Sequence, residues 1–224
     1  MSVYTIVERS ELESFLQPFD VGSLNSYEGV TAGIENTNYF VTTTKGEFVL
    51  TVFEFTPTSE LSFFLDLMVH LAKQGIASVH PLADDNGRYL QRLKGKPAAL
   101  VHRLGGASVT KPDTGQCATV GAAMARMHRA VDGFSNYRAN DRGPRWQTST
   151  AELVAPQLNS FDRALLKEVL SEQQSIAGDS LPKGVIHADL FRDNALFEGQ
   201  ELSGIIDFYY AHNGPLIYDL AITV

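Results

Sequence analysis

The chain has 224 residues, of which 44% are hydrophobic and 20% charged, a composition typical of a folded globular protein that is long enough to bury a sizeable core. Its net charge of −8, without a cluster of lysines and arginines, argues against nucleic acid as a partner, because affinity for a phosphate backbone depends on clustered positive charge. One cysteine, no secretory signal pattern and no apolar run near the roughly 20 residues that span a bilayer predict a cytoplasmic protein without a membrane partner.

The first predicted elements are a short helix and a pair of antiparallel strands. Ser10 and Glu13 fit the pattern of a capping box, ahead of apolar residues at helical spacing. Alternating and β-branched residues then occupy 39–44 and 48–53, on either side of a glycine-containing turn. This pattern is typical of an antiparallel meander.

A long helix and a second hairpin follow. Apolar residues recur at helical spacing over 58–74, and Gly75 provides a C-terminal stop. Two further strands are expected over 89–93 and 98–101, and a hinge near 101–106, where two glycines stand together. The sequence therefore predicts a sheet with one long helix in the first part of the chain.

The second part of the chain is predicted to be mainly helical. Residues 113–130 form a strong helical pattern with Asp113 as its N-cap. Residues 133–150 suggest an irregular connection, and a second helical pattern runs from about 151 to 175, with Pro156 near its first turn.

This order of elements predicts an α+β protein with two lobes. Residues 1–101 are expected to form a nucleotide-binding lobe with an antiparallel sheet, and residues 102–224 a helical catalytic lobe.

The most informative segment is His187-Ala188-Asp189-Leu190-Phe191-Arg192-Asp193-Asn194, with Asp207 following in Ile-Asp-Phe-Tyr. Protein kinases place a catalytic Asp five residues before a metal-binding Asn, and a second metal-binding Asp begins the next motif. Asp189 is therefore the predicted base, and Asn194 and Asp207 are the predicted ligands of Mg²⁺. Two short strands between 195 and 206 are expected to form a hairpin that brings residue 194 opposite residue 207.

Two residues of the motif are assigned supporting roles, and a third residue, His128, is assigned to packing. His187 is expected to brace the catalytic loop by hydrogen bonding to backbone. Arg192 either contacts the substrate or holds the loop in place, and we assign it to the support of the loop. His128 is interpreted as a satisfied packing histidine, because no carboxylate or cysteine stands at metal-binding spacing from it.

The segment 33–39 lies where a phosphate-binding loop between two strands is expected. It contains one glycine, Gly33, followed by Asn36, Thr37 and Asn38, whose amides or hydroxyl are candidate donors to phosphate. An ordinary polar connection between strands fits this segment equally well.

Thr51 occupies the strand position at which protein kinases carry a phosphate-pairing lysine. A hydroxyl brings no charge, so the positive charge for ATP is expected from Mg²⁺ or from a basic residue such as Lys45 or Arg192. Val101, next to the predicted hinge, completes the residues assigned to the nucleotide.

With these residues in place, the chain resembles the aminoglycoside phosphotransferase and choline kinase superfamily, and within it the homoserine kinase branch. The segments that carry the resemblance are Val3-Tyr4-Thr5, 33–39, 48–51, Gly75-Ile76, 125–128, 184–194, 206–209 and 218–221. The resemblance implies a protein-kinase-like fold and phosphorylation of L-homoserine by ATP with Mg²⁺, a step of threonine biosynthesis.

Members of this family continue for several dozen residues beyond the position of Val224, so we expect a chain truncated at its C-terminus, with some acceptor-binding residues beyond it. Two other functions stay open. One is a kinase for another small alcohol, such as an aminoglycoside or a choline-like compound. The other is a nucleotide-binding fragment without catalysis. The oligomeric state is not predicted.

Overall fold

The computed structural model describes residues 3–31, 33, 35–176 and 181–224. Ile34, which belongs to the predicted phosphate-binding loop, lies outside these residues. No helix in the described ranges is long and apolar enough to cross a membrane.

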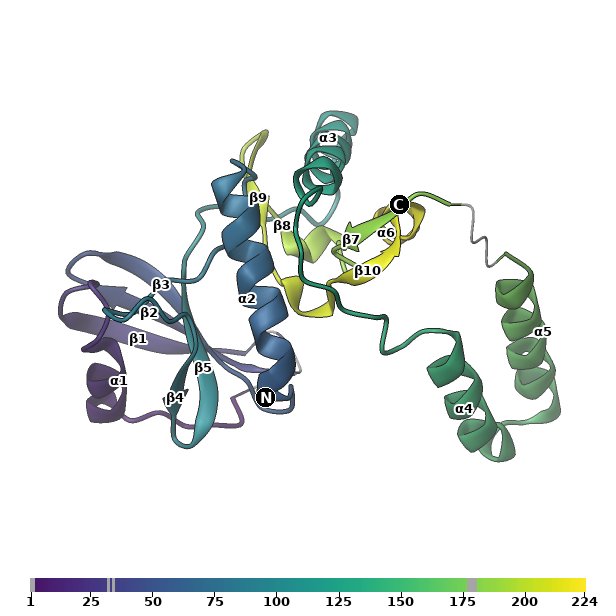
Figure 1. The fold of residues 1–224 in the computed structure, drawn as a ribbon, viewed down its shortest axis with the longest axis horizontal. Coiled ribbons are helices and arrows are strands. Elements are labelled where there is room, and N and C mark those ends of the chain that lie inside the picture. The colour runs from purple at the N-terminus through teal and green to yellow at the C-terminus, as the bar shows by residue number, and fades with distance from the viewer. Residues whose placement is uncertain (1–2, 32, 34, 177–180) are drawn as a thin grey trace.

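The N-terminal half is built on a five-stranded antiparallel sheet with the strand order β1-β2-β3-β5-β4 (Figure 1). Its strands are β1 (Leu24–Val30), β2 (Thr37–Thr43), β3 (Gly46–Val52), β4 (Gln91–Leu93) and β5 (Lys96–His102). The expected meander and hairpin are confirmed. Strand β1 was not predicted, because its sequence LNSYEGV is mostly polar and it forms at the edge of the sheet, where only β2 pairs with it.

Helix α1 (Arg9–Leu16) packs against one face of this sheet. The predicted helix exists, but the predicted capping box is wrong. The helix begins one residue before Ser10, and the side chain of Glu11 accepts a hydrogen bond of 2.8 Å from the N–H of Glu8. The side chains of Leu12, Phe15 and Leu16 are buried with the sheet residues.

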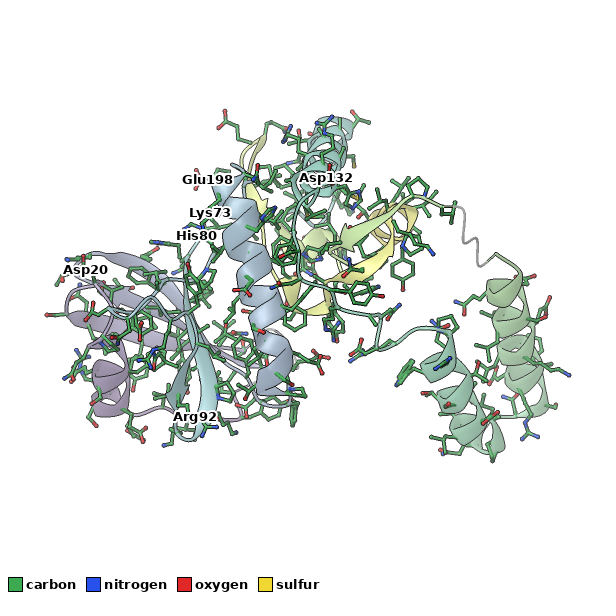
Figure 2. The ribbon with its side chains drawn as sticks, viewed as in Figure 1. Asp20, Lys73, His80, Arg92, Asp132 and Glu198 are labelled. Atoms are coloured by element: carbon green, nitrogen blue, oxygen red, sulfur yellow. The ribbon has the colours of Figure 1, made fainter. Side chains whose placement is uncertain are left out.

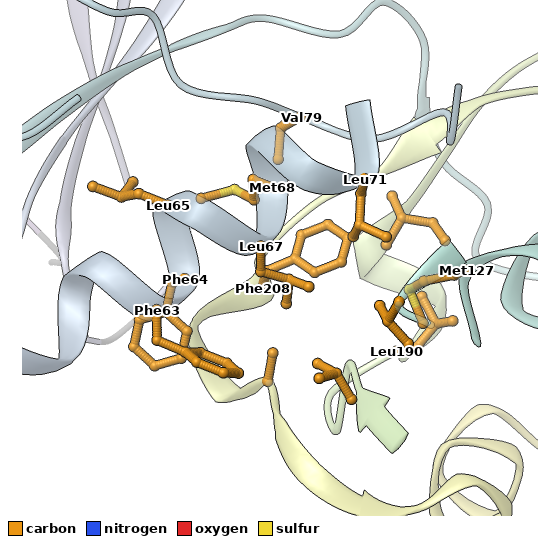
Figure 3. Close-up of a cluster of buried hydrophobic side chains, with 14 of the residues drawn as sticks. Phe63, Phe64, Leu65, Leu67, Met68, Leu71, Val79, Met127, Leu190 and Phe208 are labelled. Atoms are coloured by element: carbon orange, nitrogen blue, oxygen red, sulfur yellow. The ribbon is translucent and has the colours of Figure 1, made fainter. Parts of the chain in front are cut away.

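Helix α2 (Thr58–Lys73) follows β3 and packs against the second half of the chain. It ends before Gly75, whose φ of +72° is the left-handed conformation expected after a helix. The buried face of α2 joins side chains from both halves in one core, which Figure 3 shows around Phe64, Leu67 and Phe208. Each such fully buried side chain contributes about 1.5–3 kcal/mol. The predicted lobe boundary after residue 101 falls inside β5.

The second half contains four α-helices and two small sheets among the described residues. The helices are α3 (Thr114–Ala130), α4 (Pro144–Val154), α5 (Ser160–Ile176) and α6 (Leu216–Thr223). One sheet pairs β7 (Lys183–Ile186) with β10 (His212–Pro215), and the other has the order β6-β8-β9, with bounds Ala107–Ser108, Ala195–Glu198 and Glu201–Ile205. Short 3₁₀ turns occur at Ala155–Gln157 (η1), Arg192–Asn194 (η2) and Phe208–Tyr210 (η3).

Helix α3 and its N-cap Asp113, which accepts a 2.8 Å hydrogen bond from the N–H of Gln116, are confirmed. The predicted irregular connection over 133–150 is wrong in its second part, because α4 begins at Pro144. The single helix predicted over 151–175 is two helices, broken by the 3₁₀ turn that contains Pro156. A proline removes a helical N–H and sterically disfavours continuation, which explains the break.

Helices α4 and α5 extend away from the rest of the molecule (Figure 1). Leu153 and Phe161 in these helices are 73% and 74% exposed. Charged residues such as Asp20, Arg92 and Asp132 lie on the surface of the main body (Figure 2).

Candidate active site

The hairpin β8–β9 brings the ends of the catalytic motif together. Ala195 pairs with Ile205, and the N–H of Ile206 donates to the main-chain oxygen of Asn194 at 3.0 Å. The side-chain amide of Asn194 donates to the main-chain oxygen of Asp189 at 2.7 Å and to its carboxylate at 3.2 Å. Asp207 follows directly, so Asp189, Asn194 and Asp207 meet as the motif spacing predicts.

Two non-glycine residues of this site have left-handed backbone conformations. Both Ala188 and Asp207 have a φ of +65°. For residues with a Cβ this conformation costs on the order of 1–2 kcal/mol. Such strain is typical of functional sites, where the surrounding structure imposes it.

Several carboxylates act on one another at this site. Burial raises the pKa of Asp207 to about 6, and the negative charges of Asp189 and Glu35 contribute. Burial also raises the pKa of Asp189, and Glu35 adds to the rise, whereas the hydrogen bond from Asn194 and the charge of Arg142 oppose it. A region with this excess of negative charge favours a bound cation.

The donor set fits Mg²⁺ bound together with water and phosphate. Within the described ranges, no three His, Cys, Asp or Glu side chains converge at metal-binding distance. The candidate ligands are therefore the carboxylate of Asp207 and the amide oxygen of Asn194. Mg²⁺ is typically held by one or two protein oxygens and completes its shell with waters and substrate phosphates.

Asp219 supports the catalytic loop and was not predicted as a site residue. Its carboxylate is fully buried and accepts hydrogen bonds from the N–H groups of His187 (2.9 Å) and Ala188 (2.7 Å) and from Nε2 of His128 (2.7 Å). Burial works to raise the pKa of Asp219, but these three donors outweigh it and lower the pKa. His128 is thus satisfied by a carboxylate 91 positions away, which sequence spacing did not show.

His187 braces the loop through both ring nitrogens. Nδ1 accepts from the N–H of Asp189 at 3.2 Å, so Nε2 carries the proton and donates to the oxygen of Ile206 at 2.9 Å. Burial lowers the pKa of His187, which keeps the ring neutral. Arg192 donates to the main-chain oxygen of Thr110 at 3.1 Å, and its side chain remains 59% exposed.

The residues predicted to bind phosphate lie in the connection between β1 and β2 and at the start of β2. Gly33 has a φ of +91°, and a Cβ there would meet open space. The Asn36 side chain is buried, and its Oδ1 has no hydrogen-bond partner in the described part of the chain. A buried polar atom without a partner fits a ligand contact. The Thr37 hydroxyl is already engaged, because it accepts from the N–H groups of Tyr4 and Thr5 and donates to Glu54.

An uncharged group occupies the position of the kinase lysine. The hydroxyl of Thr51 donates to Oδ1 of Asn38 at 2.8 Å, and the phenol of Tyr209 interacts with the same hydroxyl. Tyr209 directly follows the Asp-Phe pair of the metal motif, so this group links the sheet to the catalytic hairpin. Burial raises the pKa of Tyr209, so its phenol stays neutral.

Of the two basic residues suggested in place of that lysine, Lys45 lies far from the predicted phosphate-binding segment. Lys45 pairs with Asp20 at the β2–β3 turn, roughly 20 Å along β2 from the phosphate-loop end of that strand. Arg192 is engaged with Thr110, as described above. Val101 is buried in β5 beside Val49, immediately before the predicted hinge.

Glu35, Arg142 and Tyr210 form a second polar group beside Asp189, which we call the Arg142 group. Glu35 accepts a hydrogen bond from the hydroxyl of Tyr210 and pairs with the guanidinium of Arg142 at 3.4 Å. That guanidinium lies 4.8 Å from the centre of the Tyr210 ring. No sequence signal pointed to Glu35, Arg142 or Tyr210, because they come from three distant segments.

Comparison with protein-family models matches residues 26–224 to the "Phosphotransferase enzyme family". A homoserine kinase of Methylobacillus flagellatus is 46% identical over all of this chain, which covers 70% of that protein. A homoserine kinase of Neisseria meningitidis serogroup B is 45% identical over all of this chain, which covers 73% of it.

Solved structures show the same fold at lower identity. A spectinomycin phosphotransferase in complex with ADP and spectinomycin matches with a TM-score of 0.76 at 15% identity, over 97% of this chain and 74% of that one. An amicoumacin kinase in complex with AMP-PNP, Ca²⁺ and its ligand matches with a TM-score of 0.75 at 17% identity, over 97% and 68%. The kinase-like α+β fold is therefore confirmed.

Proposed function

The chain belongs to the phosphotransferase enzyme family, and we propose that it transfers the γ-phosphoryl group of ATP to the side-chain hydroxyl of L-homoserine. The observation that carries this proposal is the convergence of Asp189, Asn194 and Asp207 in a chain that is 46% identical, over its whole length, to a homoserine kinase. The convergence of the three residues supports phosphoryl transfer, and the similarity to a homoserine kinase supports the choice of acceptor.

Asp189 is the proposed base for the acceptor hydroxyl. Its carboxylate is oriented by the amide of Asn194, and the loop that carries it is held by His187 and Asp219. The raised pKa of Asp189 makes the carboxylate a better proton acceptor than an exposed aspartate. The alcohol proton passes to this carboxylate as the hydroxyl oxygen bonds to the γ-phosphorus of ATP, while the bond from that phosphorus to the bridging oxygen breaks and ADP leaves.

Asp207 and Asn194 are the proposed holders of Mg²⁺. When bound, the ion neutralises charge on the triphosphate. The carboxylate of Asp207, with the negative charges of Asp189 and Glu35 nearby, supports this assignment.

The nucleotide is proposed to lie under the β1–β2 connection, in the lobe formed by residues 1–101. Gly33, Asn36 and Asn38 belong to that connection or follow it, and the unpartnered oxygen of Asn36 supports a contact there. In this arrangement Thr51 acts on the nucleotide site through Asn38 and Tyr209. Val101 lines the hinge side, and we assign no direct contact to Thr37.

The proposal is tested by replacing Asp189 with Asn. Loss of a general base costs roughly 10²- to 10⁴-fold, so kcat for homoserine should fall by that factor with little change in the KM for ATP. ADP release is measured with homoserine, an aminoglycoside and choline as acceptors. Asp132→Asn, at an exposed aspartate, is the matched control. Equal turnover of Asp189→Asn and the control would remove Asp189 from this role, and a higher kcat/KM for another acceptor would replace homoserine.

The metal assignment is tested by replacing Asp207 with Asn. Losing one charged ligand should raise the Mg²⁺ concentration for half-maximal activity roughly ten- to hundredfold. Mg²⁺ titration of activity and calorimetric titration of Mg²⁺ with ADP both measure this. An unchanged Mg²⁺ requirement in Asp207→Asn would contradict the assignment.

A further inference from the structure

The Arg142 group has the chemistry of an amino acid binding site. A guanidinium and a carboxylate stand next to each other, with 3.4 Å between Nη2 of Arg142 and Oε1 of Glu35. Tyr210, which donates to Glu35, lies in η3, three residues after Asp207, and Glu35 directly precedes Asn36 in the β1–β2 connection. The group therefore joins the metal motif to the proposed nucleotide-binding segment.

The segment that leads to Arg142 is held in place by hydrogen bonds and an ion pair. The main-chain N–H of Arg142 donates to Oδ1 of Asn140 at 2.9 Å. Four residues before it, Arg138 exchanges hydrogen bonds with Asn213, its N–H donating to Oδ1 at 2.9 Å and its oxygen accepting from the N–H at 2.8 Å. Arg138 also forms an ion pair of 2.8 Å with Glu60 of α2. The segment that presents Arg142 is thus fixed to the strand following the metal motif.

The charged ends of the group remain accessible. The side chain of Arg142 is 52% exposed and that of Glu35 is 42% exposed. Their separation of 3.4 Å is longer than a typical charge-assisted hydrogen bond of about 2.7–2.9 Å. A ligand with both charges can therefore replace the pair without leaving either group unpaired.

We propose that Arg142 binds the carboxylate, and Glu35 the ammonium group, of an α-amino acid whose side-chain hydroxyl faces Asp189. Tyr210 donates to Glu35 and supports the guanidinium with its ring, so it is a positioning residue for both. This inference rests on the proposed function and adds the residues that select a zwitterionic acceptor. A planar guanidinium suits a carboxylate, which accepts two parallel hydrogen bonds.

Two analogues separate the roles of the two charges. 4-Hydroxybutanoate keeps the hydroxyl and carboxylate of homoserine, and 3-amino-1-propanol keeps its hydroxyl and ammonium group. Arg142→Gln should raise the KM for homoserine and the inhibition constant of 4-hydroxybutanoate roughly ten- to hundredfold, with 3-amino-1-propanol little changed. Glu35→Gln should raise the KM for homoserine and the inhibition constant of 3-amino-1-propanol by a similar factor, with 4-hydroxybutanoate little changed. The controls are Arg145→Gln and Glu28→Gln, at exposed residues.

Trp146 provides a reading that does not depend on turnover. It is the single tryptophan, and its ring lies 6.0 Å from the Arg142 guanidinium. Titration with homoserine in the presence of Mg-ADP should change the fluorescence emission of Trp146 in the wild type and in Arg145→Gln. In Arg142→Gln, the half-maximal change should require a higher homoserine concentration.

The outcomes separate this inference from the proposed function. Homoserine turnover in the wild type, with Arg142→Gln and Glu35→Gln equal to their controls, would overturn the inference and leave the function standing. A uniform loss for all three compounds, or a rise in the KM for ATP alone, would also overturn it, since it would show that the pair only holds the β1–β2 connection. No homoserine turnover or binding in the wild type would overturn both.

Discussion

Two polar groups near the catalytic motif are held together in different ways. In one group, the carboxylate of Asp219 is fully buried and accepts from His128, His187 and Ala188 at 2.7–2.9 Å. In the Arg142 group, Glu35 and Arg142 are about half exposed and pair at 3.4 Å. Both groups are built on a carboxylate, and both join segments that are distant in the sequence.

The difference separates a group that holds its partners from a group that exchanges them. The donors around Asp219 are buried, so water cannot replace the Asp219 carboxylate as their acceptor. If that side chain were removed, each of these donors would lose its hydrogen bond. The exposed charges of the Arg142 group are solvated when apart, so breaking the pair costs little, and a ligand can compete for each charge. We therefore expect stability to depend on the first group and acceptor affinity on the second.

The largest effect is expected from Asp219→Ala. Nε2 of His128 and two N–H groups of the loop would lose their acceptor, and each buried donor left unsatisfied costs about 1–3 kcal/mol, so the three together should cost at least about 3 kcal/mol. The free energy of unfolding, measured by urea titration, should fall by about that amount, and kcat should fall with it. Asp132→Ala is the surface control. If Asp219→Ala is as stable as this control, the comparison fails.

A smaller effect is expected from pH. Because the folded-state pKa of Asp219 is lowered, this residue contributes stability that is fully present above its unfolded pKa of about 3.9 and is lost as the pH falls through the lower folded value. The free energy of unfolding of the wild type should therefore decrease below about pH 4. Asp219→Asn should show a smaller decrease over the same range. Parallel profiles for the two proteins would show that this carboxylate is not stabilised in its charged form.

The smallest effect is expected from a double-mutant cycle on Arg142 and Glu35. Exposed ion pairs contribute about 0.2–1 kcal/mol, so the coupling energy of Arg142→Gln and Glu35→Gln in thermal or urea unfolding should not exceed that range. A coupling near that of a buried pair would mean that the Arg142 group is structural, and would remove the contrast between the two groups.

Local patterns were sufficient for much of the fold. The helices at 58–73 and 114–130 followed from apolar spacing, a glycine stop and an N-cap, all of which act within a few residues. Prediction was wrong where the signal was ambiguous. Two overlapping capping patterns stand near Ser10, and a helix interrupted at Pro156 still has helical spacing on both sides. Strand β1 is stabilised by its neighbour β2 more than by its own residues.

By itself the sequence determined the catalytic hairpin and the three residues that it brings together. These residues lie within 19 positions, and a tight turn converts such a spacing into contact. Only the tertiary structure decided that Asp219 meets His128, that Tyr209 contacts Thr51, and that Glu35 meets Arg142 and Tyr210. Such pairs are brought together by the packing of whole elements. The local spacing of residues around a polar side chain does not reveal a partner that lies 91 to 175 positions away.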